Sequence, residues 1–274
     1  MLERIVSDAP VFLFVAVRCF ATIMTLPLFS SRTVPRTAKI ALAGYMAFFI
    51  FPQISLADGI FSSYKNYISP EGNFSLEYIL LLAGEAMIGI ILGFFVQIIF
   101  ASFSTAGQFF AFQMGLSASE VYDSLSQVEN PLMGQFFNFM AMLVFLQNNW
   151  LQMLLLKGMS ESFKVISAIS IVDNSRFFAE FMMKSLTLLF KDALIIALPV
   201  MASLFLINVT VGILSKAAPQ MNLLSEGFPI MLIVSFVILF FLIPFLCSFF
   251  VRAFNTGFSD LINFIESFSK GGKG

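Results

Sequence analysis

Four ionisable side chains stand inside long apolar runs, and they are the residues best placed to do chemistry: Arg18, Glu85, Lys191 and Asp192. A charged side chain at the centre of a membrane helix costs roughly 2.5–3.5 kcal/mol on insertion scales, so such groups should face protein or water. Arg18 and Glu85 lie deep in their runs, where a salt bridge, a contact with a partner subunit and a transport role all remain open. Lys191 and Asp192 lie near the start of their run, where an interfacial position is expected.

These residues form no recognisable catalytic set. The chain has 0 His, which removes the commonest general base and the commonest zinc ligand. Cys19 and Cys247 each sit in an apolar run and are expected to be small buried residues. Glu85 and Asp192 could share a proton only if their separate segments met. We therefore expect no catalytic, cofactor or metal site, and a protein that is not an enzyme.

The composition is that of an integral membrane protein. Hydrophobic residues make up 59% of the chain and charged residues 11%, with a mean hydropathy of +0.93. An ordinary soluble domain is roughly 45–50% apolar and about 25% charged. The net charge of −1 offers no basic surface for nucleic acid.

The apolar pattern predicts an all-α polytopic membrane protein with about six long apolar helical segments. The second segment, only 15 residues long, is short for a span and can be re-entrant. Residues 55–77 are polar and are expected to form a surface loop. The six segments are residues 10–29, 40–54, 78–103, 132–156, 186–214 and 228–251.

The distribution of Lys and Arg predicts the orientation. If all six segments cross, the basic residues divide 9 against 4; if the second does not cross, they divide 11 against 2. The positive-inside rule favours the second arrangement. It places the N-terminus and the loop after the third segment outside, and the C-terminus in the cytoplasm.

The third segment carries a row of residues spaced by four: Glu85, Gly89, Gly93 and Gln97. Small residues at this spacing let two membrane helices approach closely. The row predicts a helix-packing face, within this chain or with a partner, although glycine is also common in membrane helices by chance.

Residues 104–131 form a central stretch of a different kind, rich in small, amide and aromatic side chains, with three carboxylates and no Lys or Arg. A simple turn between helices needs only a few residues. We expect a loop that acts as a plug, because aromatic and methionine side chains can form a dewetted constriction. The candidate gate residues are Gly107, Phe110, Phe112, Gln113, Met114, Gly115, Leu116 and Ser117.

A turn between the last two apolar segments contains Pro219, Gln220, Met221 and Asn222. Proline lacks an N–H and helps to end the preceding helix. The turn is expected to present its amide side chains to neighbouring subunits, or alternatively to solvent.

Several residue clusters resemble one known family. They are Gly84-Glu85, Phe112-Gln113-Met114-Gly115-Leu116-Ser117, Ala217-Ala218-Pro219-Gln220-Met221-Asn222 and Gly227-Phe228-Pro229. Together they resemble the FliR family of flagellar type III export-gate proteins, whose injectisome relatives are called SctT. The resemblance covers nearly the whole chain, and the last two clusters are the most specific. One departure is that Ser124, where the family often has Pro, follows Asp123.

The resemblance implies one FliR-like subunit joined to FliP-like and FliQ-like membrane subunits in a helical hetero-oligomeric gate for unfolded export substrates. An FlhB-like export protein and membrane lipid are further implied partners. The implied location is the flagellar basal body in the bacterial inner membrane. A single membrane domain over 1–274 would comprise a FliP-like part (1–183, with the loop at 104–131), a FliQ-like helical hairpin (184–268) and a flexible tail (269–274).

Three other functions remain open at this point. The chain could serve an injectisome instead of a flagellum. A small-solute secondary transporter would use Arg18, Glu85 and broken helices as a substrate site. A membrane scaffold without a conduit would leave the central loop packed and dry.

Overall fold

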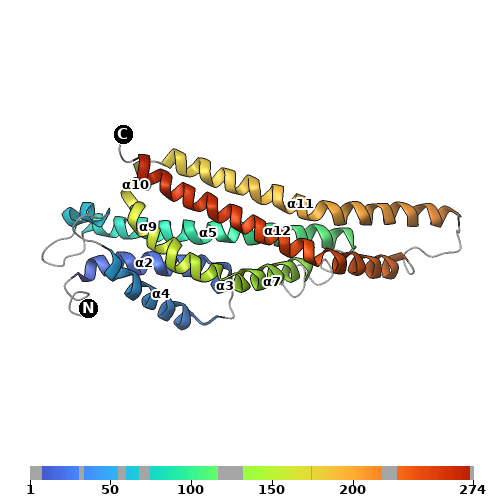
Figure 1. Ribbon diagram of the computed structural model, residues 1–274, viewed down its shortest axis with the longest axis horizontal. Coiled ribbons are helices and arrows are strands. Elements are labelled where there is room, and N and C mark those ends of the chain that lie inside the picture. The colour runs from blue at the N-terminus through green and yellow to red at the C-terminus, as the bar shows by residue number, and fades with distance from the viewer. Residues whose placement is uncertain are drawn as a thin grey trace. The chain divides into compact units, whose positions relative to one another are not determined.

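The computed structural model describes residues 8–30, 34–54, 60–67, 75–116, 132–173, 175–217 and 227–271. Every regular element in these ranges is a helix, which confirms the predicted all-α class (Figure 1). The chain divides into two compact units. Unit 1 comprises residues 1–98, 148–185 and 256–274, and unit 2 comprises residues 99–147 and 186–255.

Unit 1 begins with α2 (Ala9–Thr25), which carries a proline in its first turn, where the missing N–H is harmless. The helix ends at Leu26, whose extended backbone (φ −63°, ψ 135°) suits a residue before Pro27. The short α3 (Pro27–Ser30) follows, and then α4 (Arg36–Ile50) packs against α2 and leads into the 3₁₀ turn η1 (Phe51–Gln53).

The predicted surface loop over residues 55–77 is wrong in its middle. Residues Ile60–Tyr67 form a 3₁₀ helix, η2, and the side chains of Phe61 and Tyr64 are fully buried. Side chains three residues apart lie on the same side of a 3₁₀ helix, so these two rings enter the core together. Both contact the ring of Phe14 in α2, with centroid distances of 6.4 and 5.2 Å.

Helix α5 (Leu76–Gln113) is longer than the predicted third segment and takes in the first ten residues of the predicted loop at 104–131. The prediction of the loop's start is therefore wrong. The small residues there serve helix packing, because a Cβ at Gly107 would collide with the backbone of Met133 and Gly134 in unit 2. The helix ends at Gly115, whose φ of 79° and the bond from Leu116 N–H to the Ala111 carbonyl (3.0 Å) close its last turn.

The fourth apolar segment is broken where three amide residues follow one another. Helix α7 (Leu132–Gln147) stops before Asn149, which takes the left-handed conformation with φ 57°. A short α8 (Trp150–Gln152), a π-helical stretch η4 (Met153–Gly158), α9 (Met159–Val165) and α10 (Ala168–Asp173) follow.

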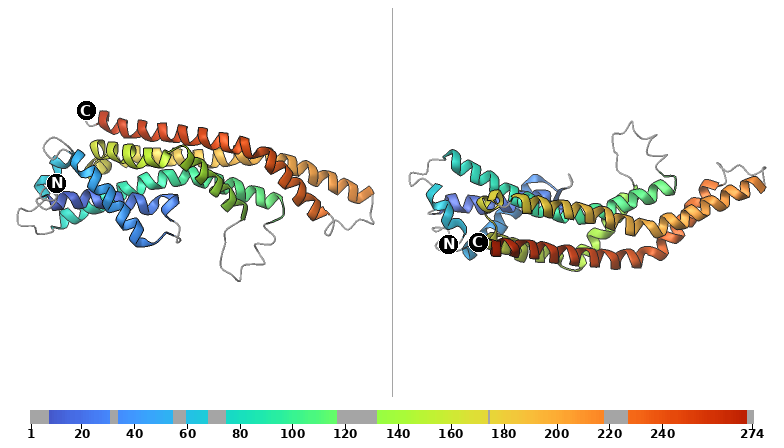
Figure 2. Two further views of the ribbon diagram at one scale, coloured as in Figure 1. Left: turned by 60° about the horizontal axis from the view of Figure 1, so that its bottom comes forward. Right: turned by 90° about the horizontal axis from the view of Figure 1, so that it is seen from above.

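The two longest helices, α11 (Ser175–Ala217) and α12 (Phe228–Gly271), run alongside each other in opposite directions (Figures 1 and 2). Within unit 1 the ring of Phe264 stacks on that of Phe181, with centroids 3.9 Å apart. Helix α12 continues to Gly271, so the tail predicted for 269–274 is helical over its first three residues, and the chain leaves the helix at a glycine.

The core of unit 2 is aromatic. The ring of Phe250 from α12 lies 5.5 Å from Phe100 and 4.7 Å from Phe103, both in α5. The ring of Phe145 from α7 lies 5.3 Å from Phe100 and 4.8 Å from Phe254. These edge-to-face contacts join three helices without any buried charge.

Three of the described helices are long and apolar enough to cross a membrane: residues 76–113, 175–214 and 229–266. The broken pair of residues 132–147 and 150–165 would make a fourth if it is one span. The polytopic membrane class is confirmed, whereas the predicted number of six segments is not. One reason is that α2 has only 17 residues, about 25 Å of helix, against a hydrocarbon core of about 30 Å.

Candidate functional site

The most polar buried site of unit 1 is built around Arg18. Its side chain, from the middle of α2, is fully buried. The guanidinium donates from Nε to Glu85 Oε2 at 2.6 Å, from Nη2 to the Ile166 carbonyl at 2.7 Å and from Nη1 to Ser162 Oγ at 3.3 Å. Its central carbon also lies 4.2 Å from the ring centroid of Phe163. The charge is thereby spread over an ion pair, two neutral acceptors and an aromatic face.

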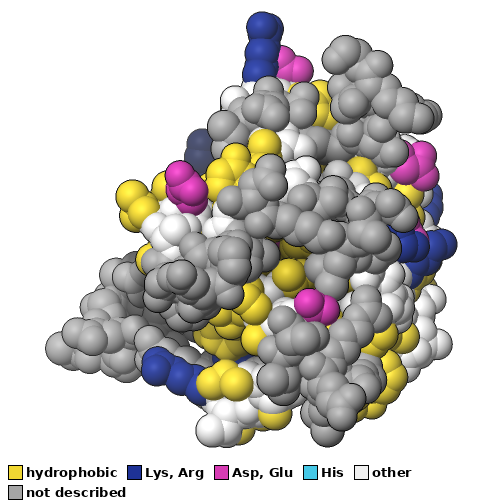
Figure 3. Space-filling model, turned by 90° about the vertical axis from the view of Figure 1, so that its left-hand side faces the viewer, with side chains coloured by type: hydrophobic (Ala, Val, Ile, Leu, Met, Phe, Trp, Pro, Cys, Tyr) yellow, Lys and Arg dark blue, Asp and Glu magenta, His cyan; other side chains and the backbone are white. Residues whose placement is uncertain are grey.

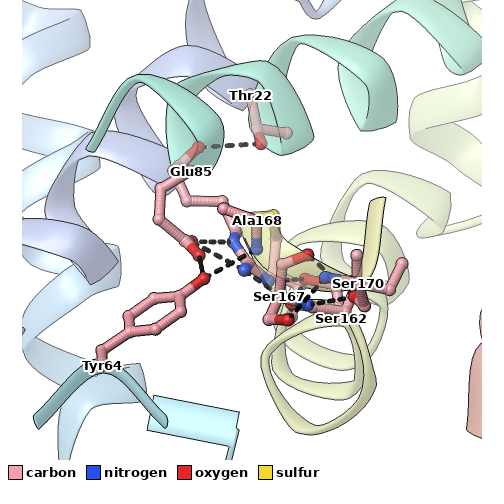
Figure 4. A network of polar contacts seen from close by, with 10 residues as sticks. Thr22, Tyr64, Glu85, Ser162, Ser167, Ala168 and Ser170 are labelled. Carbon is pink, nitrogen blue, oxygen red and sulfur yellow. Dashed lines mark hydrogen bonds and ion pairs between the residues drawn. The ribbon is translucent and has the colours of Figure 1, made fainter. Parts of the chain in front are cut away.

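Glu85, on α5, extends the network to the other side. Its Oε1 accepts a hydrogen bond from the Tyr64 hydroxyl at 2.8 Å, and the Tyr64 oxygen accepts one from the Ala168 N–H at 2.7 Å. Figure 4 shows Tyr64 and Glu85 pointing toward each other, with Ser162, Ser167 and Ala168 nearby. Burial, and next the negative charge of Glu85, raise the pKa of Tyr64 well above its ordinary value, so the hydroxyl stays protonated as the donor.

Close helix packing brings the ion pair together. A Cβ at Gly89 would collide with the Arg18 carbonyl, and one at Gly93 would collide with Thr25. The two glycines therefore let α5 approach the backbone of α2, one and two turns away from Glu85. Gln97 does not share this face and is exposed. On a helix of 3.6 residues per turn, residues spaced four positions apart are each rotated by about 40° around the helix axis relative to the one before. The fourth residue of such a row has therefore rotated away from the contact.

The network differs in kind from the other described ion pairs. The side chains of Arg18 and Glu85 are 0% exposed, whereas those of Lys164 and Glu161 are 58% and 46% exposed. An exposed pair contributes little to stability. Removing one partner of a buried pair costs about 3–5 kcal/mol, because the other charge is left uncompensated.

Of the uses left open for Arg18 and Glu85, the structure shows a salt bridge. The two groups satisfy each other, a backbone carbonyl and the Tyr64 hydroxyl. Lys191 and Asp192 lie in unit 2 on α11, the first exposed and the second half-buried.

The gate candidates that the structure describes lie at the end of α5 in unit 2. Phe110 and Met114 are buried, while Phe112 is 71% exposed and is the aromatic candidate that projects outward. Gln113 is half-buried, and Gly115 and Leu116 form the final turn. Ser117 and the rest of the predicted loop lie outside the described residues. The predicted subunit-contact turn, Pro219, Gln220, Met221 and Asn222, lies outside them as well.

The sequence reasoning missed Tyr64 and the backbone at Ile166–Ala168. Tyr64 stands in a polar stretch that was assigned to the surface, and its one available signal was the aromatic pair Phe61 and Tyr64 spaced by three. The backbone groups leave no signal of their own in a sequence. In the part of the chain that the structure describes, no cluster of three His, Cys, Asp or Glu side chains could hold a metal ion.

The fold and the site together define a polytopic, all-helical membrane protein. The buried pair of Arg18 and Glu85 joins α2 to α5. Comparison with known proteins gives the family. A family model described as Bacterial export proteins, family 1, matches residues 9–257. The chain belongs to this family.

Three similar curated proteins are flagellar. Flagellar biosynthetic protein FliR of Bacillus subtilis (strain 168) is 35% identical over 240 residues, covering 87% of this chain and 88% of the relative. The protein of the same name from Borreliella burgdorferi is 32% identical over 257 residues (93% and 91%), and that from Escherichia coli (strain K12) is 30% identical over 268 residues (96% of each). This chain is thus a FliR-family component of the flagellar export apparatus, as its residue clusters predicted.

Proposed function

We propose that this chain is a core subunit of the flagellar type III export gate. It joins FliP-like and FliQ-like subunits around a conduit for unfolded export substrates. The proposal rests on the large exposed apolar surface of α11 and α12. In their most apolar stretches only 22% and 17% of residues are buried by the rest of the chain, against 39% in α5. So much apolar surface requires lipid, other subunits or both.

Many of the exposed side chains on these helices are large and apolar. On α11 they include Phe190, Leu198 and Phe205, and on α12 Ile233 and Phe240. Lipid can cover the apolar side chains on the outward side of each helix. Neighbouring subunits in a hetero-oligomeric gate would cover the apolar side chains on its other sides, because a helix that is apolar all round is a buried helix. Figure 3 shows hydrophobic side chains reaching the surface of unit 1 beside charged ones.

The family resemblance suggests a separate role for each of two parts of the chain. Residues 1–183 act as a FliP-like part and residues 184–268 as a FliQ-like hairpin. The antiparallel course of α11 and α12 supports a hairpin role for the second part. An FlhB-like export protein is a further partner, and the assembly stands in the bacterial inner membrane at the flagellar basal body. No catalytic step is assigned to the chain.

The stretch that follows α5 acts as the plug of the conduit. Phe112, exposed on the last turn of α5, lies at the base of this stretch and can contribute an apolar constriction. Gly115 supplies the left-handed turn that releases the chain from the helix. Displacing the stretch would open a path wide enough for an unfolded polypeptide.

Purification in mild detergent followed by measurement of the intact mass tests the assembly. The expected result is one copy of this chain with several copies of two smaller membrane subunits. A chain that purifies alone, or only with copies of itself, contradicts the proposal.

Partial deletion of the loop tests the plug separately. Removing residues 118–127 while keeping both ends should leave the complex assembled but leaky to small ions. An assembled complex with a membrane as tight as that of the intact protein rejects the plug and leaves the assembly role standing.

A further inference from the structure

The junction between α9 and α10 is a helix break without an obvious covalent cause. Helix α9 ends at Val165, Ile166 is extended (φ −107°, ψ 120°), and α10 starts at Ala168. No Pro or Gly occurs from Met159 to Asp173. Sharp breaks usually arise from such residues, from π-bulges or from an inserted side chain. A continuous helix over residues 159–173 is therefore open to this sequence.

Two groups from outside the segment and two serines within it satisfy the backbone at the break. The Ile166 carbonyl accepts from Arg18, and the Ala168 N–H donates to Tyr64. Ser167 and Ser170 each donate their N–H to the other's hydroxyl oxygen, at 2.9 and 3.0 Å. In a continuous helix the same groups would bond to residues four positions away. The segment thus has two ways to satisfy one set of donors and acceptors.

Helix α5 packs closely against the residue that follows the break. A Cβ at Gly84 of α5 would collide with the Cβ of Ala168, so the absence of a side chain at Gly84 leaves the space, here called the seat, in which Ala168 lies. On the other side, Ile166 and Ile171 line a small apolar cavity with Ile88 and Phe178. The break is thus tightly packed at Ala168 and borders a small cavity at Ile166 and Ile171.

We propose that Arg18, Tyr64 and Gly84 form a conformational latch that holds residues 159–173 as a broken helix. Releasing the latch lets the segment become one continuous helix. The latch couples α2, η2 and α5 to the segment that leads into α11. A change in any of the three residues should therefore alter the backbone conformation of residues 159–173. This device is independent of the conduit and plug roles proposed above.

The test uses the full-length protein in its membrane complex, with native Cys19 as reporter and Cys247→Ser as background. Cys19 is fully buried, next to Arg18 on α2. Tyr64→Phe removes two hydrogen bonds of the latch, and Gly84→Ala expels Ala168 from its seat. Both should speed the labelling of Cys19 by a maleimide at least several-fold. Gly44→Ala is the matched control, because a Cβ at this helical glycine meets no atom within 4 Å.

A proline separates helix straightening from general loosening. Ser167→Pro forbids a continuous helix, and the extended backbone of Ile166 is already that of a residue before proline. The proline also removes both hydrogen bonds that the N–H and the hydroxyl of Ser167 make with Ser170, so Ser167→Ala, which loses the hydroxyl but permits a continuous helix, is its control. Added to either latch variant, Ser167→Pro should return Cys19 labelling to the wild-type rate, and alone it should leave Cys19 protected. The latch is refuted if both latch variants keep Cys19 protected or if labelling stays fast with the proline added. Exposure of Cys19 by the proline alone also contradicts it.

Discussion

Glu85→Gln is the sharpest perturbation of the buried ion pair. The amide has nearly the volume of the carboxylate, so the packing of α5 on α2 is kept while the negative charge is lost. Arg18, which is fully buried, then has neutral acceptors and the ring of Phe163, but no carboxylate, to balance its charge. Leaving a buried charge uncompensated costs about 3–5 kcal/mol of stability.

The double variant Arg18→Met with Glu85→Gln gives the decisive comparison. It removes both charges and keeps a long side chain in place of the arginine. The Ile166 carbonyl then loses its donor, which costs about 1–3 kcal/mol for a buried group. The double variant should therefore be less destabilised than Glu85→Gln alone.

The assay is thermal or denaturant unfolding of the purified complex in detergent, with Glu161→Gln as control. Glu161 pairs with Lys164 on the surface, so its loss should change stability by less than about 1 kcal/mol. If Glu85→Gln is no worse than this control, the ion pair does not stabilise the fold. If the double variant loses as much stability as the single variants Glu85→Gln and Arg18→Met added together, the two residues are not energetically coupled and the prediction is wrong.

Three further predictions concern helix packing and topology. Gly93→Leu should prevent normal assembly, because the new side chain drives α5 away from Thr25. Gly44→Leu, on an open helix face, should co-purify partners normally. Equal co-purification of partners by the two variants would contradict the packing role of Gly93. Gly107→Leu should lower the stability of the complex by roughly 1–3 kcal/mol through overpacking against α7, measured by thermal unfolding, and an unchanged midpoint would argue against that contact. Single cysteines at Ser119 and Ser267 should react from the outer and cytoplasmic sides respectively, because the basic residues divide 11 against 2; labelling of both only from the cytoplasm rejects the topology.

The sequence predicted the helical membrane class because that class depends on composition and on long apolar runs. It also singled out Arg18 and Glu85, because a charge inside such a run is costly wherever it lies. It could not pair them, since two residues 67 positions apart meet only through the packing of α2 and α5. Gly89 and Gly93 pointed to that packing, while Gln97 showed the limit of a four-residue spacing on a helix.

The errors arose where local composition and tertiary packing disagree. Residues 104–108 are polar or small, which is typical of loops, yet in α5 Gly107 allows close contact with α7. Tyr64 lies in a polar stretch that would suit solvent, yet Glu85 and Ala168 bind its hydroxyl in the core. Neither outcome can be read from a window of neighbouring residues, because the deciding partner comes from another segment.

Contact between this chain and a polypeptide in transit is the most direct test of the central claim. A photocrosslinking amino acid at Phe112, which is exposed on the last turn of α5, would report on an export substrate stalled by a folded domain at its end. Tyr45, exposed on α4, is the control position for nonspecific crosslinking. We expect crosslinks to the stalled substrate from position 112 and none from position 45. Crosslinks to neighbouring subunits alone, with no substrate captured at position 112, would contradict a conduit at this place.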